Sequence, residues 1–543
     1  MRTIVRRLIN ANTDNCPFTN YNLDPFQRSM IPEMAIKEEK RMEHTVQPER
    51  EFRISSILIP LIAIIAGVFM VALDSTAMNV ALPTLLKDFD TNLTTLQWVV
   101  TGYMLAQASV IPLSGWLSDR FGAKRVFLSA VVLFTIGSIL CALPNSAEWL
   151  ITFRVIQGLG GGSVIPIAMA YVYRLSPPGK VGVVMGLMGI PVLFAPAIGP
   201  VLSGWLVEFH SWRWIFLINI PIGIICLIIG MRKLPKVERT EVPGMDKLGM
   251  ILGPLAFAAL TYGVSQGAES WTSSKTLFGL GLGAAALILF VIVELRARTP
   301  LLELRVMGSI DFSLGIIVQW IGQFGLYGAL FLMPQFLQQA RGFGAFDTGL
   351  TMLPQAIASG LVMPIAGMLF DKIGVRWLIV GGLGLISGAL YQYSHVDLTI
   401  TSRDVILPLL MCGAGMGLMI MPMNTHLLNK APRHLVNRVT SLTNSMQQVI
   451  NSLAISTLVT ILTSRTATHA LEMKEAAAAA GVSSAATSPE AVKLATQNLL
   501  VKGFDDTFHI MMFVAIGGAV LGLLLRRGSK KAEEAPHTEM MHG

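Results

Sequence analysis

Two ionisable residues stand inside long apolar stretches of this sequence, where a charge is costly. Asp74 lies in MVALDSTAMNVALP (residues 70–83), at the end of about twenty apolar residues that begin near Ile54, and Arg154 follows the polar stretch PNSAEW by a few residues. An ionisable residue within a bilayer costs about 2.5–3.5 kcal/mol on insertion scales and indicates a function. A carboxyl group there can bind and release a proton, and a nearby guanidinium would pair with its ionised form. We therefore interpret Asp74 as a proton carrier and Arg154 as its partner.

Two plainer interpretations of this pair stay open. From the rise of a helix, Asp74 lies roughly 30 Å from Ile54, so it could simply end the apolar span at the membrane surface. Asp74 and Arg154 could also form a static ion pair that ties two helices together.

The composition places the chain in a membrane and excludes several other classes of protein. Of the 543 residues, 53% are hydrophobic and 14% are charged, and the mean hydropathy is +0.60, far more apolar than is typical of soluble proteins. Basic residues lie in short clusters between apolar runs, which argues against nucleic-acid binding. The stretch GLGGGS (residues 158–163) has no preceding strand and no following lysine, so it is not a phosphate-binding loop. The cysteines lie too far apart to predict a metal site, and we expect no cofactor and no enzymatic activity.

Fourteen stretches are long and apolar enough to predict an all-α integral membrane protein, because a helix needs roughly twenty residues to cross a bilayer. They begin near Ile54, Thr95, Arg125, Trp149, Val181, Trp214, Lys247, Thr276, Phe312, Thr348, Arg376, Val405, Val439 and Thr507. Lysine and arginine concentrate in alternate connections, which predicts that both termini are cytoplasmic and that the protein is a multi-pass inner or plasma membrane protein. The segment 464–503 is predicted to be an outside loop of low complexity that is partly helical or mobile.

The chain contains an internal duplication. GWLSDRFGAKR (residues 115–125) recurs as GMLFDKIGVRW (residues 367–377) at an offset of 252, and the glycines of QGLGGGSVIP (residues 157–166) recur from residue 413 at nearly the same offset. Two concordant echoes predict two bundles of six helices. We divide the chain into an extension (1–53), a first bundle (54–232), a linker with two extra spans (233–311), a second bundle (312–527) and a tail (528–543).

Several of these stretches resemble one family. LDSTAMNVALP (residues 73–83), GWLSDRFGAKR, RVIQGLGGG (residues 154–162) and WRWIFLINIPIG (residues 212–223) are similar to motifs of the major facilitator superfamily, and specifically of its fourteen-span drug:proton antiporter group. The resemblance implies a major facilitator fold and a cavity-facing carboxylate at Asp74. Its fifth-helix antiporter motif is matched at Gly186, Gly199, Pro200 and Gly204, whereas Ala195 and Ser203 replace two glycines of the motif.

The duplicated loop motif supplies a candidate gate. Gly115 and Gly122 bracket a tight turn in which Asp119 can face the N-terminus of a neighbouring helix, while Arg120 and Arg125 can pair across the interface between the bundles. The resemblance implies a latch that favours one facing state. Retention of the loop on the cytoplasmic side by positive charge alone is the alternative.

Neutral polar residues in the second bundle are candidates for a substrate cavity. At the positions that correspond to Asp74 and Arg154, this bundle has Tyr327 and Leu409, so it lacks the charged pair. Hydrogen bonds between helices are the alternative role of these polar residues. The candidate cavity residues are Gln157 of the first bundle and, in the second bundle, Gln319, Gln323, Tyr327, Asn444 and Gln448.

From these features we expect a proton-coupled multidrug exporter that moves lipophilic and cationic compounds by alternating access and confers antibiotic resistance. Its expected partners are small-molecule drugs, protons and the lipid bilayer, with a periplasmic adaptor if the host has an outer membrane. The alternatives are an exporter of one specific metabolite, antibiotic or siderophore, and a membrane sensor or scaffold that does not transport.

Overall fold

The computed structural model describes residues 55–91, 93–176, 180–235, 246–267, 270–297, 300–398, 403–432, 435–479 and 489–525. The chain divides into two units, residues 1–57 and 58–543, and only residues 55–57 of the first are described. The predicted extension (1–53) and tail (528–543) lie outside the described residues. Apart from residues 55–57, all described residues belong to the second unit.

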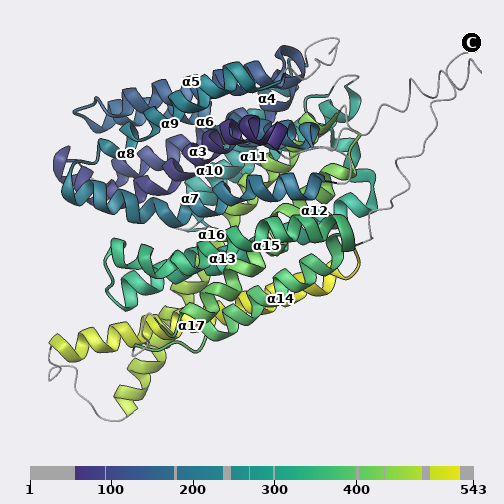
Figure 1. Cartoon of the computed structure of the whole chain (residues 1–543). Helices are drawn as coiled ribbons and strands as arrows, with labels where there is room; N and C mark the ends of the chain where they lie inside the picture. Colours follow the sequence, from purple (N-terminus) through teal and green to yellow (C-terminus); the bar gives the residue numbers. More distant parts are fainter. Residues whose placement is uncertain are drawn as a thin grey trace, which may run out of the picture. The chain divides into compact units, whose positions relative to one another are not determined.

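Every regular element among the described residues is a helix (Figure 1). The elements of the predicted first bundle are α3 (Ser55–Asp88), α4 (Leu93–Phe121), α5 (Ala123–Cys141), α6 (Ala147–Leu175), α7 (Val181–Phe209), α8 (Trp214–Leu217) and α9 (Asn219–Lys233). The linker holds α10 (Gly249–Gly267), α11 (Ser274–Arg296) and η1 (Leu304–Gly308). The predicted second bundle holds α12 (Ile310–Gln335), η2 (Phe336–Ala340), α13 (Ala345–Ile373), α14 (Val375–Tyr393), α15 (Ile406–Asn429), α16 (Val436–Ala479) and α17 (Pro489–Gly522).

Eleven helical segments of the described chain are long and apolar enough to cross a membrane, with α8 and α9 forming one of them. The other three long helices, α4, α7 and α10, bring the described segments of 19 residues or more to fourteen. Thirteen of the fourteen begin within three residues of the predicted starts. The last, α17, begins at Pro489 rather than near Thr507, and α16 continues to Ala479. Alanine-rich sequence favours helix, so both sides of the segment 464–503 are helical rather than open loop.

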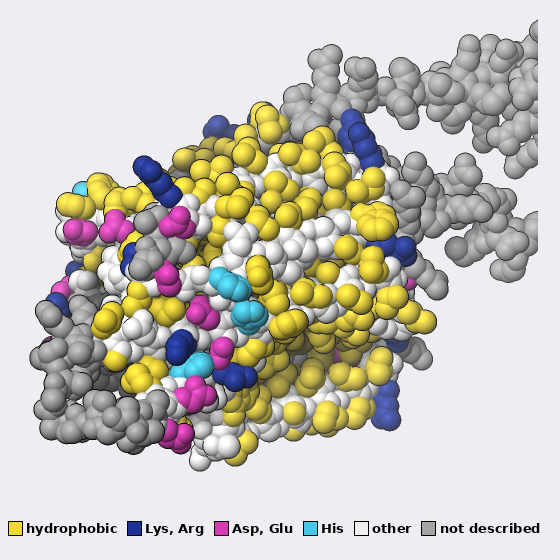
Figure 2. Space-filling model, turned by 90° about the horizontal axis from the view of Figure 1, so that it is seen from below, with side chains coloured by type: hydrophobic (Ala, Val, Ile, Leu, Met, Phe, Trp, Pro, Cys, Tyr) yellow, Lys and Arg dark blue, Asp and Glu magenta, His cyan; other side chains and the backbone are white. Residues whose placement is uncertain are grey.

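Large apolar side chains cover much of the outside of the molecule, as a bilayer requires. Hydrophobic side chains dominate the face drawn in Figure 2; acidic and histidine side chains gather mostly toward the left of that view, whereas basic side chains lie on both sides. On α11, Phe278 is 67% exposed and Ile288 is 61% exposed. Exposed apolar surface on this scale marks contact with lipid or a partner rather than with water.

The internal duplication reappears as matching contacts between helices. A Cβ atom on Gly158 of α6 would lie 2.6 Å from the Tyr103 carbonyl oxygen of α4, and Gly413 of α15 meets the Gln355 carbonyl of α13 in the same way. Tyr103 and Gln355 are 252 positions apart, which is the offset of the repeated loop motif. The glycines of both repeats therefore allow the same pairs of helix backbones to pack closely.

Two sets of helix contacts join the predicted bundles. In the first set, α7 lies along α13, and in the second, α4 and α6 pack against α16. The extra helix α10 packs against both α4 and α16. Trp98 of α4 stacks on Tyr262 of α10 at 6.2 Å, and Ser456 of α16 donates a hydrogen bond to the Val264 carbonyl of α10 at 2.6 Å.

Candidate functional site

Asp74 lies in the interior of α3, where its side chain is buried. The residue is 1% exposed, and α3 continues to Asp88 beyond it. This position does not fit a residue that ends a span at the membrane surface. A buried carboxylate must be paired and hydrogen-bonded to be tolerated, and the neighbouring helices supply those partners.

Arg154 of α6 is the cation that faces Asp74. Its Nη1 donates a hydrogen bond to Asp74 Oδ2 at 2.6 Å, and both side chains are almost completely buried. The guanidinium also lies over the ring of Tyr103, with Cζ 3.9 Å from the ring centroid. Its Nε donates to the Val99 carbonyl oxygen at 3.2 Å. The structure thus brings together the two charged residues that the sequence had singled out.

Two amide side chains complete the coordination of Asp74. Gln157 of α6 and Asn219 of α9 donate to the same oxygen, Asp74 Oδ1, at 3.0 and 3.1 Å. Gln157 also accepts a hydrogen bond from Arg154 at 2.8 Å and donates to Ser138 at 2.7 Å. Gln157 was predicted to line the substrate cavity; it is 0% exposed and belongs to the Asp74 cluster.

Sequence reasoning missed Asn219 and Ser138. Asn219 has 0% exposure and stands at the start of α9, and Ser138 lies in the last turn of α5 with 0% exposure. A signal for Asn219 was present, because it is the only amide in the apolar run WIFLINIPIGIICLIIG (residues 214–230). The serine had no such signal, since hydroxyl side chains are common in membrane helices and bond to their own backbone.

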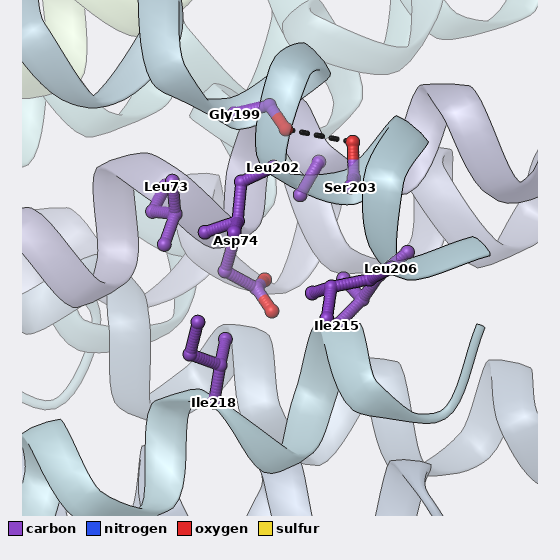
Figure 3. Close-up of a pocket in the computed structure, with 9 residues that line it drawn as sticks. Leu73, Asp74, Gly199, Leu202, Ser203, Leu206, Ile215 and Ile218 are labelled. Carbon is purple, nitrogen blue, oxygen red and sulfur yellow. Dashed lines mark hydrogen bonds between the residues drawn. The ribbon is translucent and has the colours of Figure 1, made fainter. Parts of the chain in front are cut away.

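A small cavity lies beside Asp74. Figure 3 shows the Asp74 carboxyl group pointing toward the space beside Leu206, Ile215 and Ile218. Apart from Asp74, the lining is apolar or small, with residues from α3, α7 and α8. Asp74 is therefore the polar group that a proton or cation entering this cavity meets, because Ser203 already donates to the Gly199 carbonyl at 2.7 Å.

The glycines of the predicted antiporter motif make close contacts along α7. Gly199 faces Thr76 of α3, and a Cβ atom on Gly186 would lie 2.7 Å from the Met363 carbonyl oxygen of α13. Gly204 is half-buried, and the side chain of Pro200 lies outside the described residues. Close helix packing at these positions leaves little room for larger residues.

Asp119, in the last turn of α4, joins the predicted halves at one end of the molecule. We call the end where α4 meets α5 and α13 meets α14 the basic end. Asp119 is 1% exposed; it accepts hydrogen bonds from Asn437 at 2.6 Å and Arg438 at 3.2 Å, and it pairs with Arg174 at 3.7 Å. Because Asn437 and Arg438 start α16, Asp119 faces a neighbouring helix N-terminus, as the motif suggested.

The basic residues that reach Asp119 are not those of the loop motif itself. Arg120 and Arg125 are exposed, whereas Arg438 and Arg174 supply the cations. Gly115 is tightly enclosed, because a Cβ atom there would lie 2.7 Å from the Asn437 carbonyl oxygen. At Gly122 the backbone takes φ 90°, a conformation that favours glycine.

The second copy of the loop motif makes a similar contact with a different chemistry. Asp371, in the last turn of α13, accepts a hydrogen bond from the backbone N–H of Gly182 near the start of α7 at 3.3 Å. Gly182 and Gly367 meet backbone to backbone at the same place. We call the Asp119 and Asp371 contacts the two latches of the basic end.

The remaining predicted cavity residues are dispersed. Gln319 of α12 is 5% exposed and donates to Asn424 of α15 at 2.9 Å, which matches the alternative role of binding helix to helix. Asn444 donates to the Thr440 carbonyl at 2.8 Å within α16. Gln323 is buried, and Tyr327 and Gln448 are half-buried.

Comparisons with known proteins agree with this architecture. The profile of the Major Facilitator Superfamily matches residues 64–455. The chain is 30% identical over 489 residues to the lincomycin resistance protein LmrB of Bacillus subtilis (strain 168), covering 90% of this chain and 98% of LmrB. It is 33% identical over 407 residues to the multidrug resistance protein B homolog of Mycobacterium tuberculosis (strain ATCC 25618 / H37Rv), covering 74% and 75%.

Solved structures share the fold. The proton:xylose symporter XylE bound to 6-bromo-6-deoxy-D-glucose aligns with a TM-score of 0.56 at 15% identity, covering 88% of this chain and 97% of XylE. At this identity the likeness concerns the fold alone. The profile match spans well over half of the sequence, and the chain therefore belongs to the Major Facilitator Superfamily.

Proposed function

We propose that this protein is a multidrug exporter driven by the inward movement of protons, with Asp74 as the proton carrier. The observation that carries the proposal is the buried Asp74 cluster, in which a carboxylate is balanced by Arg154 and two amides and is reached by a small cavity. A membrane-buried carboxylate with a switchable partner is the device from which proton relays are built.

Protonation of Asp74 changes every contact in the cluster. A neutral carboxyl group no longer attracts the Arg154 guanidinium, which keeps the Gln157 oxygen, the Val99 carbonyl and the Tyr103 ring as neighbours. The positions of α3 and α6 are then held by weaker, neutral contacts. Proton binding thereby biases a two-state element, which is the requirement for coupling to a conformational change.

The direction of transport follows from where the cavity and the latches lie. The cavity beside Asp74 is bounded by α8, which follows the α7 connection remote from the basic end. Positive charge at the α4–α5 and α13–α14 connections favours a cytoplasmic basic end. A proton entering through the cavity would then come from outside, while the latches close the cytoplasmic side.

The substrate class rests on the relatives and on the chemistry of the interior. Two relatives carry names that refer to lincomycin resistance and multidrug resistance. The second bundle offers amides and tyrosine, and the methionine-rich helix α15 supplies soft, adaptable side chains of the kind that suit varied apolar ligands. Lipophilic, often cationic compounds fit such an interior.

The test is ethidium efflux from cells under an imposed pH gradient. We expect efflux by the native protein to collapse when the gradient is removed, and Asp74→Asn to abolish efflux at equal expression. Asp347→Asn, which changes an exposed carboxylate in the first turn of α13, is the matched control and should leave efflux intact. Efflux that survives both gradient removal and Asp74→Asn would refute the mechanism. Absence of efflux by the native protein across a panel of compounds would favour a narrow exporter or a sensor.

A further inference from the structure

A second buried acid lies in the extra helix pair, outside the Asp74 cluster. Glu294, near the end of α11, is 1% exposed; the backbone N–H groups of Leu301 and Leu302 face its carboxyl group, but no side chain of the described residues donates a hydrogen bond to either oxygen. A buried polar atom without a partner costs about 1–3 kcal/mol, and a charged one costs more. A buried carboxyl group of this kind is tolerated when a proton or another cation neutralises it.

Asp246, just before α10, faces Glu294. Its Oδ1 accepts a hydrogen bond from the Gly249 backbone at 2.9 Å, whereas its Oδ2 is buried without a partner among the described residues. A Cβ atom on Gly249 would lie 2.5 Å from Asp246 Oδ2 and 2.7 Å from Glu294 Oε1. The two carboxyl oxygens are therefore neighbours, and the missing side chain of Gly249 makes their approach possible.

One cation is shared between this acid pair and the first latch. The charged groups that face Glu294 are Asp246 and Arg438 of α16, and the neutral backbone N–H groups of Leu301 and Leu302 also face it. Arg438 already donates to Asp119 at 3.2 Å and to the Pro300 carbonyl at 2.9 Å. Asp119 and Glu294 thus both face the Arg438 guanidinium, which already donates two hydrogen bonds.

Apolar packing ties the acid pair to the latch mechanically. Trp116 of α4, Phe257 of α10, Phe290 of α11 and Leu442 of α16 form one buried cluster with Leu301 of the connecting segment. Separation of α4 from α16 must therefore disturb the surroundings of Glu294. This cluster also keeps water from the carboxyl oxygens, which strengthens every electrostatic interaction there.

We propose that Asp246 and Glu294 form a second proton-binding site, and that its occupancy controls the latch through Arg438. A shared proton lets one carboxyl group donate to the other and leaves a single negative charge. Loss of that proton makes Glu294 a competitor for Arg438, which weakens the Asp119 contact and releases the basic end. The inference rests on the proposed function only in treating the basic end as a gate.

The test measures the latch directly in the full-length protein in nanodiscs. Spin labels at the exposed positions Arg232 and Lys372, introduced as Arg232→Cys and Lys372→Cys in a background without native cysteines, report the separation of the two halves by pulsed electron resonance. One coupled proton can change the ratio of open to closed molecules by up to tenfold per pH unit. We expect this pH dependence in the parent and its loss in Glu294→Gln, with the closed distance favoured at every pH.

Further variants separate the possible outcomes. Asp246→Asn should also flatten the pH dependence, and agreement between the two variants guards against misfolding of either one. Glu303→Gln, on the segment between α11 and η1, is the control and should leave the pH dependence unchanged. Asp74→Asn should abolish gradient-driven efflux and keep the pH-dependent latch. An unchanged pH dependence in both Glu294→Gln and Asp246→Asn would overturn the inference and leave the proposed function standing. A pH-dependent latch without proton-driven efflux would overturn the proposed function alone.

Discussion

Removal of Arg154 should destabilise the protein because it leaves Asp74 as an unpaired buried charge. The substitution Arg154→Leu deletes three donors, to Asp74, to the Gln157 oxygen and to the Val99 carbonyl. A hydrogen bond to a charged group contributes about 1.5–3 kcal/mol and a neutral one about 0.5–1.5 kcal/mol. Breaking a buried ion pair by removing one partner costs about 3–5 kcal/mol, and we expect a loss of this size in the free energy of unfolding.

The double variant distinguishes an orphan charge from lost packing. Asp74→Asn keeps the shape of the side chain and removes its charge, so Arg154→Leu should cost about 2–3 kcal/mol less in that background than in the native protein. Reversible unfolding in mixed micelles gives all four free energies. The reasoning would be refuted if Arg154→Leu cost the same in both backgrounds, because the Asp74 charge would then have no bearing on the cost.

Three further changes test the other contacts. Gly115→Val places a side chain against the Asn437 carbonyl and should hold the basic end open. A cysteine introduced at the basic end should then be labelled faster, and an unchanged labelling rate would count against a closed latch. Gln319→Leu loses one interhelical hydrogen bond and should lower the unfolding free energy by about 0.6–1.7 kcal/mol with an unaltered substrate profile, whereas an altered profile would indicate a cavity role. Trp271→Phe removes the donor to Thr460 that joins the extra helices to α16 and should cost about 1 kcal/mol; no loss in unfolding free energy would show that this bond is dispensable.

The sequence predicted the helices and the charged pair because both signals are local or depend on the bilayer. The length of an apolar stretch and the charges at its ends predict a membrane span. A single carboxylate within such a span, Asp74, must be paired with a cation, and Arg154 is that cation. The partners of Asp119 escaped prediction for the opposite reason. Arg438 lies 319 positions away, in a segment whose composition resembles any other basic connection. Only the packing of α4 on α16 selects Arg438 over Arg120 and Arg125.

The acid pair of Asp246 and Glu294 also escaped prediction. Glu294 stands two positions before Arg296 at the end of an apolar run, where charged residues commonly face the membrane surface. Its burial follows from the return of the segment 300–302 over the end of α11, and no local pattern encodes that return. The absence of a side chain at Gly249 matters because the two carboxyl oxygens lie close to it, and the sequence does not indicate that proximity.

The two latches use one motif but fail in different ways. The Asp119 latch depends on the cations Arg438 and Arg174, whereas the Asp371 latch relies on a neutral backbone N–H, so only the first depends on the charge of a partner side chain. Loss of one latch would weaken the closed state on one side, while the other latch would still hold the two halves together. Such a protein would leak protons before it stopped exporting, and its cost to the cell would appear as wasted membrane energy rather than as drug sensitivity.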